Sequence, residues 1–344
     1  MKQSQMISVI IPVLEINYYV IFENLPALDK QTYKNYEVIV LPNEHTPYDI
    51  ALLKQYKWLR IIPTGTVTRP AEKRDIGARE ANGDILAFID DDAYPSLEWL
   101  QKAVKSFQKQ KSVAVAGPGI LPQSVNHWEK IFDQVLNTFI GAGGYSYRFT
   151  PKKPRYVDDF PSMNFLIKKD IFHKLGGFNS KYWPGEDSKL CEDLVYKIEE
   201  QIYYDPQVII YHHRRNSLHG YLKQHGSYGF HRGAFYAHGD KNSKRLSYLI
   251  PTFFVLYLIF LVLLWLSYAV TRHRGIFNLL IFLNIPFSLY LLFEVYLFLK
   301  SAAKTRSLRI AGGAIIVLFL THFYYGLMFI KGYTTARSRQ NIYQ

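Results

Sequence analysis

Three consecutive carboxylates end an apolar run in the N-terminal third of the chain. Residues 85–89 read Ile-Leu-Ala-Phe-Ile, and Asp90, Asp91 and Asp92 follow directly. Adjacent carboxylates repel one another, so keeping them ionised at the end of a buried strand is costly unless a cation or strong donors compensate. Mg²⁺ is usually held by one or two carboxylates together with phosphate oxygens. The run therefore predicts a Mg²⁺ or Mn²⁺ site that takes a phosphorylated ligand; the alternative is an acidic turn that caps the helix beginning near Pro95.

Strands that alternate with helices are expected to position these carboxylates. The predicted strands are residues 7–14, 36–41, 59–62, 85–89 and 113–117, and the predicted helices between them are residues 72–82 and 97–108. This alternation favours a parallel α/β sheet covered by helices, in which ligands bind beyond the carboxyl ends of the strands. Further along, the pattern predicts helices at 168–175 and 188–201 and a strand at 208–211.

The C-terminal third is apolar and is expected to lie in a membrane. Three apolar runs, each close to the roughly 20 residues that cross a bilayer, occupy residues 249–270, 276–299 and 310–330. The middle run contains Asn284, Pro286 and Glu294, so a re-entrant or interfacial segment is the alternative to a full crossing. We expect a globular domain at residues 1–215, an amphipathic interfacial segment at 216–247 and a membrane region at 248–344 with about three transmembrane helices.

The net charge and the cysteine content indicate which partners and which compartment to expect. The 344 residues carry a net charge of +13 and a single cysteine, Cys191. Much of the positive charge flanks the apolar runs, which predicts contact with anionic membrane lipids and not with nucleic acid. The lone cysteine excludes an intramolecular disulfide, and no apolar leader precedes Ile7, so we expect the large domain to face the cytoplasm. Three crossings would leave Lys331, Arg337 and Arg339 outside, against the positive-inside tendency, so the topology stays open.

Five motifs occur in a fixed order along the chain. They are Ile7-Ser8-Val9-Ile10-Ile11-Pro12, the stretch Pro70-Ala71-Glu72-Lys73-Arg74-Asp75-Ile76-Gly77, the three aspartates, Gly176-Gly177-Phe178 and Gly185-Glu186-Asp187. As an ordered set they resemble the inverting family 2 glycosyltransferases over about residues 7–233. The resemblance implies a GT-A (Rossmann-like) mixed sheet flanked by helices, which binds a nucleotide-diphosphate sugar.

The resemblance also implies roles on the donor side. Asp92 would coordinate the divalent cation, with Asp90 and His212 as further ligands. The residues implied at the nucleotide sugar are Pro12, Glu15, Asn43, Lys73, Arg74, Asp75, Asp90, Asp91 and Asn164. Simpler alternatives are a solvated basic helix surface for Lys73, a structural histidine for His212 and a polar strand end for Asn164. The second strand ends Leu41-Pro42-Asn43-Glu44, where the commoner family pattern has an Asp pair, so the nucleobase stays open.

On the acceptor side an inverting transferase needs a base that removes the proton of the acceptor hydroxyl. Asp187 matches that position, and Glu186 beside it would orient or contact the acceptor. A competing pair, Glu192-Asp193, follows closely; the loop Trp183-Pro184-Gly185 favours the first pair as the exposed one. The alternative for Glu186-Asp187 is favourable charge at a helix N-terminus.

The segment that precedes the apolar runs indicates whether the product carries one added sugar or is a polymer. Gln224 and Arg232 resemble a family segment that contacts the acceptor or the diphosphate, but the Gln-x-x-Arg-Trp pattern of processive synthases is missing. We therefore expect a membrane-anchored enzyme that adds one sugar to a lipid-linked or glycan acceptor at the cytoplasmic face. The alternatives are a processive polysaccharide synthase and a catalytically silent membrane scaffold.

Overall fold

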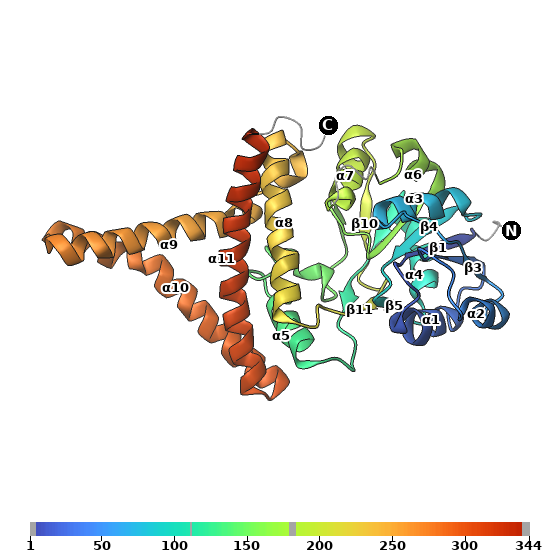
Figure 1. The fold of residues 1–344 in the computed structure, drawn as a ribbon, viewed down its shortest axis with the longest axis horizontal. Coiled ribbons are helices and arrows are strands. Elements are labelled where there is room, and N and C mark those ends of the chain that lie inside the picture. The colour runs from blue at the N-terminus through green and yellow to red at the C-terminus, as the bar shows by residue number, and fades with distance from the viewer. Residues whose placement is uncertain (1–4, 111, 179–183, 339–344) are drawn as a thin grey trace. The chain divides into compact units, whose positions relative to one another are not determined.

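The structure is a computed structural model that describes residues 5–110, 112–178 and 184–338 (Figure 1). The chain forms two compact units. Among the described residues, the first contains the segment that ends at Gln123 together with Tyr147–His213, and the second contains Ser124–Ser146 and Arg214–Ser338. Residues 124–146 thus belong with the C-terminal helices, although they lie within the N-terminal half of the sequence.

The first unit is built on an eight-stranded sheet in the order β3-β2-β1-β4-β9-β6-β10-β8. The strands are β1 Ile7–Pro12, β2 Tyr36–Leu41, β3 Leu59–Ile61, β4 Ile85–Ile89, β6 Ala114–Ala116, β8 Arg155–Val157, β9 Asn164–Lys168 and β10 Ile202–Tyr204. Strands β3, β2, β1 and β4 are parallel, as the alternation predicted. The parallel sheet that the alternation favoured does not extend to β9, which runs antiparallel to both β4 and β6, or to β8, which runs antiparallel to β10. The mixed sheet flanked by helices that the resemblance implied is confirmed.

Helices cover both faces of this sheet. On one face, α1 Leu25–Asp29 and α4 Trp99–Gln110 pack on alternate residues of the first strands in one buried apolar cluster. The other face carries α3 Pro70–Glu80 and α6 Lys169–Leu175. Gly77 lets α3 approach the sheet closely, since a Cβ there would lie 2.7 Å from the Ile10 side chain. This close approach brings the polar residues of the first turns of α3 to the carboxyl ends of the strands.

A second, three-stranded sheet completes the first unit. Its order is β5-β11-β7, with β5 Ala93–Pro95, β7 Gly119–Ile120 and β11 Ile210–His212. Strand β11 is antiparallel to β5, and His212 pairs with Ala93. The strand predicted at 208–211 therefore begins and ends later than predicted and includes His212, which pairs with the residue that follows Asp92.

Further helical segments belong to the first unit. The helix α2 Asp49–Gln55 follows β2, and a π-helical turn, Val20–Asn24, precedes α1. The helix predicted at 188–201 begins earlier and is shorter, as α7 Glu186–Glu192 followed by a π-helical turn at Asp193–Lys197. Glu186 and Asp187 therefore form the first turn of a helix.

The second unit is entirely helical within the described residues. It contains α5 His127–Leu136, α8 Leu218–His238, α9 Leu246–Thr271, α10 Arg274–Thr305 and α11 Leu308–Ser338, together with short 3₁₀ turns. Helices α9, α10 and α11 are each long and apolar enough to cross a membrane. The middle one is a single continuous helix that contains Pro286. Arg339, which bore on the predicted topology, lies outside the described residues.

Glycines bring two helices of this unit into backbone contact. Helices α8 and α11 run side by side (Figure 1). A Cβ at Gly233 would lie 2.1 Å from the carbonyl oxygen of Phe329, and one at Gly332 would lie 1.9 Å from that of Phe230. Small residues that let helix backbones approach in this way are typical of helix contacts in membranes.

Candidate active site

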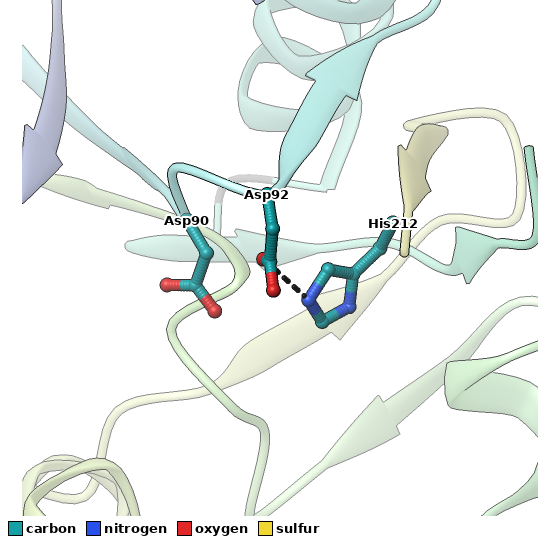
Figure 2. Close-up of side chains that lie close together, drawn as sticks. All are labelled: Asp90, Asp92 and His212. Atoms are coloured by element: carbon teal, nitrogen blue, oxygen red, sulfur yellow. Dashed lines mark hydrogen bonds and ion pairs between the residues drawn. The ribbon is translucent and has the colours of Figure 1, made fainter. Parts of the chain in front are cut away.

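The carboxylates that follow β4 meet a histidine from β11. The Asp92 carboxylate is 3.0 Å from Nε2 of His212, and one ligand atom each of Asp90, Asp92 and His212 lie within 4.8 Å of one another. Figure 2 shows the three side chains converging. Each is half-buried, which leaves the cluster accessible to an ion and its ligand. Carboxylate oxygens with one imidazole nitrogen form a donor set that suits Mn²⁺ or Mg²⁺.

Asp91 makes a separate contact. Its carboxylate accepts a hydrogen bond from the Asn17 side-chain amide at 2.6 Å, and the Asn17 oxygen accepts from the Val20 N–H. Burial, reinforced by the negative charges of Asp92 and Asp90, raises the pKa of Asp91 to about 6. Asn17 thus ties the segment after β1 to the aspartate loop, a role that no sequence pattern had indicated.

Arg74 joins the aspartate loop to the start of α7. Its Nη2 atom is 2.6 Å from a carboxylate oxygen of Asp90, and its Nη1 atom is 3.8 Å from one of Glu186. The guanidinium is buried and lies over the Phe178 ring at 5.5 Å. One cation therefore bridges the two groups of carboxylates that the sequence singled out.

Asp187 lies in a setting suited to proton transfer. It is half-buried, and its Oδ1 atom is buried with no hydrogen-bond partner among the described residues. Burial and the neighbouring Glu186 raise the pKa of Asp187 to about 7, whereas Arg74 and hydrogen bonds from Ser162 act in the opposite direction. A carboxylate whose pKa lies near neutrality is well matched to act as a general base.

The expectation that the Glu186-Asp187 pair is exposed is wrong. Glu186 is only 6% exposed, because it turns back to accept a hydrogen bond from the N–H of Gly185 and faces Arg74. Trp183, which supported that expectation, lies outside the described residues. In the competing pair, Asp193 forms an ion pair with Lys189 at 3.0 Å.

Lys73 and Asn43 form a hydrogen bond with each other beside the carboxyl ends of β1 and β2. The Lys73 ammonium is 1% exposed and donates to the carbonyl oxygens of Val13 and Leu41 and to Oδ1 of Asn43. Asn43 in turn donates to the carbonyl of Gly65 at 2.6 Å. An ammonium has three protons, so these acceptors use all of them and no proton is left for a phosphate. The alternative of a solvated basic surface for Lys73 is wrong, since the group is buried.

Asp75 and Asn164 likewise bond within the protein. Asp75 accepts a hydrogen bond from the N–H of Phe178, and its burial raises its pKa. Asn164, at the start of β9, is fully buried; its amide accepts from the Trp99 indole at 2.8 Å and donates to the Val208 carbonyl at 2.7 Å. In this arrangement Asn164 ties β9 to its neighbours and presents no polar atom to a donor sugar.

Four candidate residues remain. Pro12 is buried at the end of β1, and Glu15 is exposed in the loop that follows. Gln224 and Arg232 lie on α8, in the second unit. Arg232 stacks on Tyr248, with its guanidinium carbon 4.4 Å from the ring centroid.

Comparisons with known proteins agree with the motifs and the fold described above. Residues 8–176 match the family described as Glycosyl transferase family 2. A glucosyl-dolichyl phosphate glucuronosyltransferase of Haloferax volcanii is 22% identical over 148 residues, 40% of this chain and 46% of that one. A pre-mycofactocin glycosyltransferase of Mycobacterium tuberculosis is 25% identical over 161 residues, 46% of this chain and 33% of that one. The chain thus spans less than half the length of these two relatives.

Two comparisons extend further along the chain. The dolichyl N-acetyl-alpha-D-glucosaminyl phosphate 3-beta-D-2,3-diacetamido-2,3-dideoxy-beta-D-glucuronosyltransferase of Methanococcus voltae is 24% identical over 268 residues, 75% of this chain and 81% of that one. The mannosyltransferase PcManGT of Pyrobaculum calidifontis, solved with GDP-Man and Mn²⁺, aligns with 99% of this chain and 88% of its own at a TM-score of 0.52 and 17% identity. That likeness shows the fold. The family match, the mixed sheet and the ordered motifs together place this chain in the family 2 glycosyltransferases, with a GT-A domain that contains residues 8–176.

Proposed function

We propose that the chain is a membrane-anchored, metal-dependent glycosyltransferase that moves one sugar, with inversion, from a nucleotide-diphosphate sugar to a lipid-linked or glycan acceptor. The observation that carries the proposal is the arrangement in which Arg74 joins the Asp90, Asp92 and His212 cluster to the carboxylates that begin α7. The cluster of Asp90, Asp92 and His212 suits a metal ion with a bound diphosphate. The carboxylates that begin α7 suit a hydroxyl group that must lose a proton.

The chemistry of each side follows from its residues. Asp90, Asp92 and His212 would hold a divalent cation, whose charge neutralises the leaving diphosphate. Asp187, as its carboxylate, takes the proton of the acceptor hydroxyl while that oxygen attacks C1 of the sugar. The bond from C1 to the diphosphate oxygen breaks, and its electron pair stays on the diphosphate. The products are the glycoside, the nucleoside diphosphate and a protonated Asp187, which returns its proton to water.

The membrane region supports a lipid-linked acceptor. Three helices of this chain are apolar and long enough to cross a bilayer, and two of the relatives are named for sugar transfer to dolichyl phosphate compounds. We place the catalytic domain on the cytoplasmic face, where nucleotide sugars are made. Pro12 and Glu15 at the nucleotide, and Gln224 and Arg232 at the acceptor or diphosphate, remain predictions of the same proposal.

The test is donor turnover by purified membranes that contain the full chain. UDP-, GDP- and dTDP-sugars are supplied with Mn²⁺ or Mg²⁺ and lipid extract, and wild type is compared with Asp92→Ala, Asp187→Asn and the exposed control Asp170→Asn. We expect metal-dependent turnover of one donor that both site variants lose and the control keeps. A product with one added sugar supports single addition, and a ladder of products identifies a processive synthase. Donor binding without turnover would favour the silent scaffold.

A further inference from the structure

We propose that Arg74 is a positioning residue that holds the donor-side carboxylate Asp90 and the acceptor-side pair Glu186-Asp187 in one arrangement, and that it does not bind the diphosphate itself. This inference deepens the proposed function and rests on it. The resemblance had placed Arg74 at the nucleotide sugar, but the contacts of its guanidinium indicate a different role.

The surroundings of Arg74 leave no open side for a phosphate. Its side chain is 6% exposed, with Asp90 on one terminal nitrogen and Glu186 facing the other. The Phe178 ring covers the guanidinium, and the Nε atom is buried. A guanidinium binds phosphate through an accessible pair of N–H groups, and here protein carboxylates face both terminal nitrogens.

The fold requires a forked cation at this position. Arg74 reaches the site from α3, Asp90 follows β4, and Glu186 begins α7, so the three elements meet only in the folded chain. Glu186 is buried, and Asp187 interacts electrostatically with the same guanidinium. Carboxylates buried together without a cation would be strongly destabilising. Lysine carries its charge on a single nitrogen and lacks the planar fork whose two terminal nitrogens face the two carboxylates here.

The arrangement has a consequence for the base. Within the described residues, the titratable groups that interact with Asp187 are Glu186 and Cys191 on its own helix and Arg74 from α3. Ser162 is its hydrogen-bonding neighbour. Arg74 is the cation in this set, so its removal leaves Asp187 with burial and a like charge, opposed only by the hydrogen bonds from Ser162. The proton affinity of the base then rises, and its deprotonated form appears at higher pH.

The test compares Arg74→Gln and Arg74→Lys with wild type in the full chain. Steady-state kcat and donor KM are measured from pH 6 to pH 9, and Mn²⁺-dependent donor binding is measured separately by calorimetry. For Arg74→Gln we expect kcat to fall about 100-fold, donor Kd to change by less than about threefold, and the rising limb of the kcat profile to move up by about one pH unit. Arg74→Lys keeps the positive charge, so the rising limb of its kcat profile should stay at the wild-type pH. Its kcat should fall by a smaller factor than that of Arg74→Gln. The exposed Arg79→Gln, on the same helix, is the matched control.

Three results would overturn the inference. A donor Kd that rises tenfold or more while the pH limb stays in place would make Arg74 a diphosphate ligand. Wild-type kinetics in Arg74→Gln would remove its role altogether. If Arg74→Gln does not fold, the same readouts are taken on Arg74→Lys, and an upward shift of its limb would contradict the charge argument. The calorimetric experiment needs no turnover. A wild-type chain that binds donor without reacting refutes the proposed function, whereas a donor Kd that rises tenfold or more in Arg74→Gln refutes this inference.

Discussion

Replacing Asp187 with asparagine should abolish sugar transfer and, at neutral pH, stabilise the folded chain. Burial beside Glu186 raises the pKa of this carboxyl from 3.8 to about 7. Each pKa unit corresponds to about 1.4 kcal/mol, so at pH 8 the buried charge costs the native state at most about 4 kcal/mol. Asparagine matches the Ser162 donors less well, a loss of about 1 to 2 kcal/mol. The expected net gain at pH 8 is therefore about 2 to 3 kcal/mol.

The sign of this effect fixes its pH dependence. Between pH 3.8 and about 7 the folded chain keeps the Asp187 proton while the unfolded chain releases it, so wild-type stability falls as pH rises through this window. Below pH 3.8 both states are protonated and the contribution disappears. The advantage of Asp187→Asn over wild type should accordingly grow by about 2.5 kcal/mol between pH 5 and pH 8.

Thermal unfolding of the full chain in detergent, followed by tryptophan fluorescence, measures this difference. Tm changes by about 2 to 4 °C for each kcal/mol of stability. The expected gain in stability therefore corresponds to a rise of roughly 5 to 10 °C in Tm at pH 8. The control is Asp193→Asn, which removes a partly exposed ion pair with Lys189 and should lower stability by less than about 1 kcal/mol without abolishing turnover. A variant that melts below wild type at pH 8, or that differs from it equally at pH 5 and pH 8, would refute the argument from the buried charge.

Three further changes test other parts of the structure. Asp92→Ala should weaken Mn²⁺ binding at least about tenfold by isothermal titration, because it removes one of three converging ligands, while the exposed Asp170→Ala should leave it unchanged. Asn164→Ala should lower the free energy of unfolding by about 2 to 4 kcal/mol, since two buried hydrogen bonds lose their partner, yet leave calorimetric donor Kd within about twofold; a large loss of donor affinity would restore its predicted contact with the sugar. Gly233→Ala should destabilise the α8–α11 contact by about 1 to 3 kcal/mol in a detergent melt, because its Cβ would clash with a backbone carbonyl, whereas Gly312→Ala on α11 meets open space and should stabilise slightly; equal melts would refute the close contact.

Local pattern was enough to predict the elements around the metal-binding cluster. The strands β2 and β4 lie at the predicted residues, and Asp90 to Asp92 follow β4, because apolar runs and the turn after them are short-range features. The apolar helices α9 to α11 were likewise evident from length and composition. The ordered motifs indicated the family, and the matching residues 8–176 confirm it.

Pairing between distant segments was decided only by the tertiary structure. β9 runs antiparallel to its neighbours β4 and β6, and α5 belongs to the second unit although it lies far along the chain from the other helices of that unit. His212 reaches Asp92 because β11 pairs with β5, and no local hydrophobic pattern in the sequence indicates this pairing.

The roles of polar side chains also depended on the folded chain. Lys73 and Arg74 are adjacent basic residues on one helix, yet Lys73 bonds to strand-end carbonyls while Arg74 bridges the two carboxylate groups. Asn164 bonds to Trp99 on α4 and to the carbonyl of Val208 in the loop before β11. The sequence alone determined which residue types were present and that the three aspartates directly follow β4. Whether each polar group faces a ligand or the protein was decided by tertiary structure, because a buried polar group must find a partner and these partners lie far along the chain.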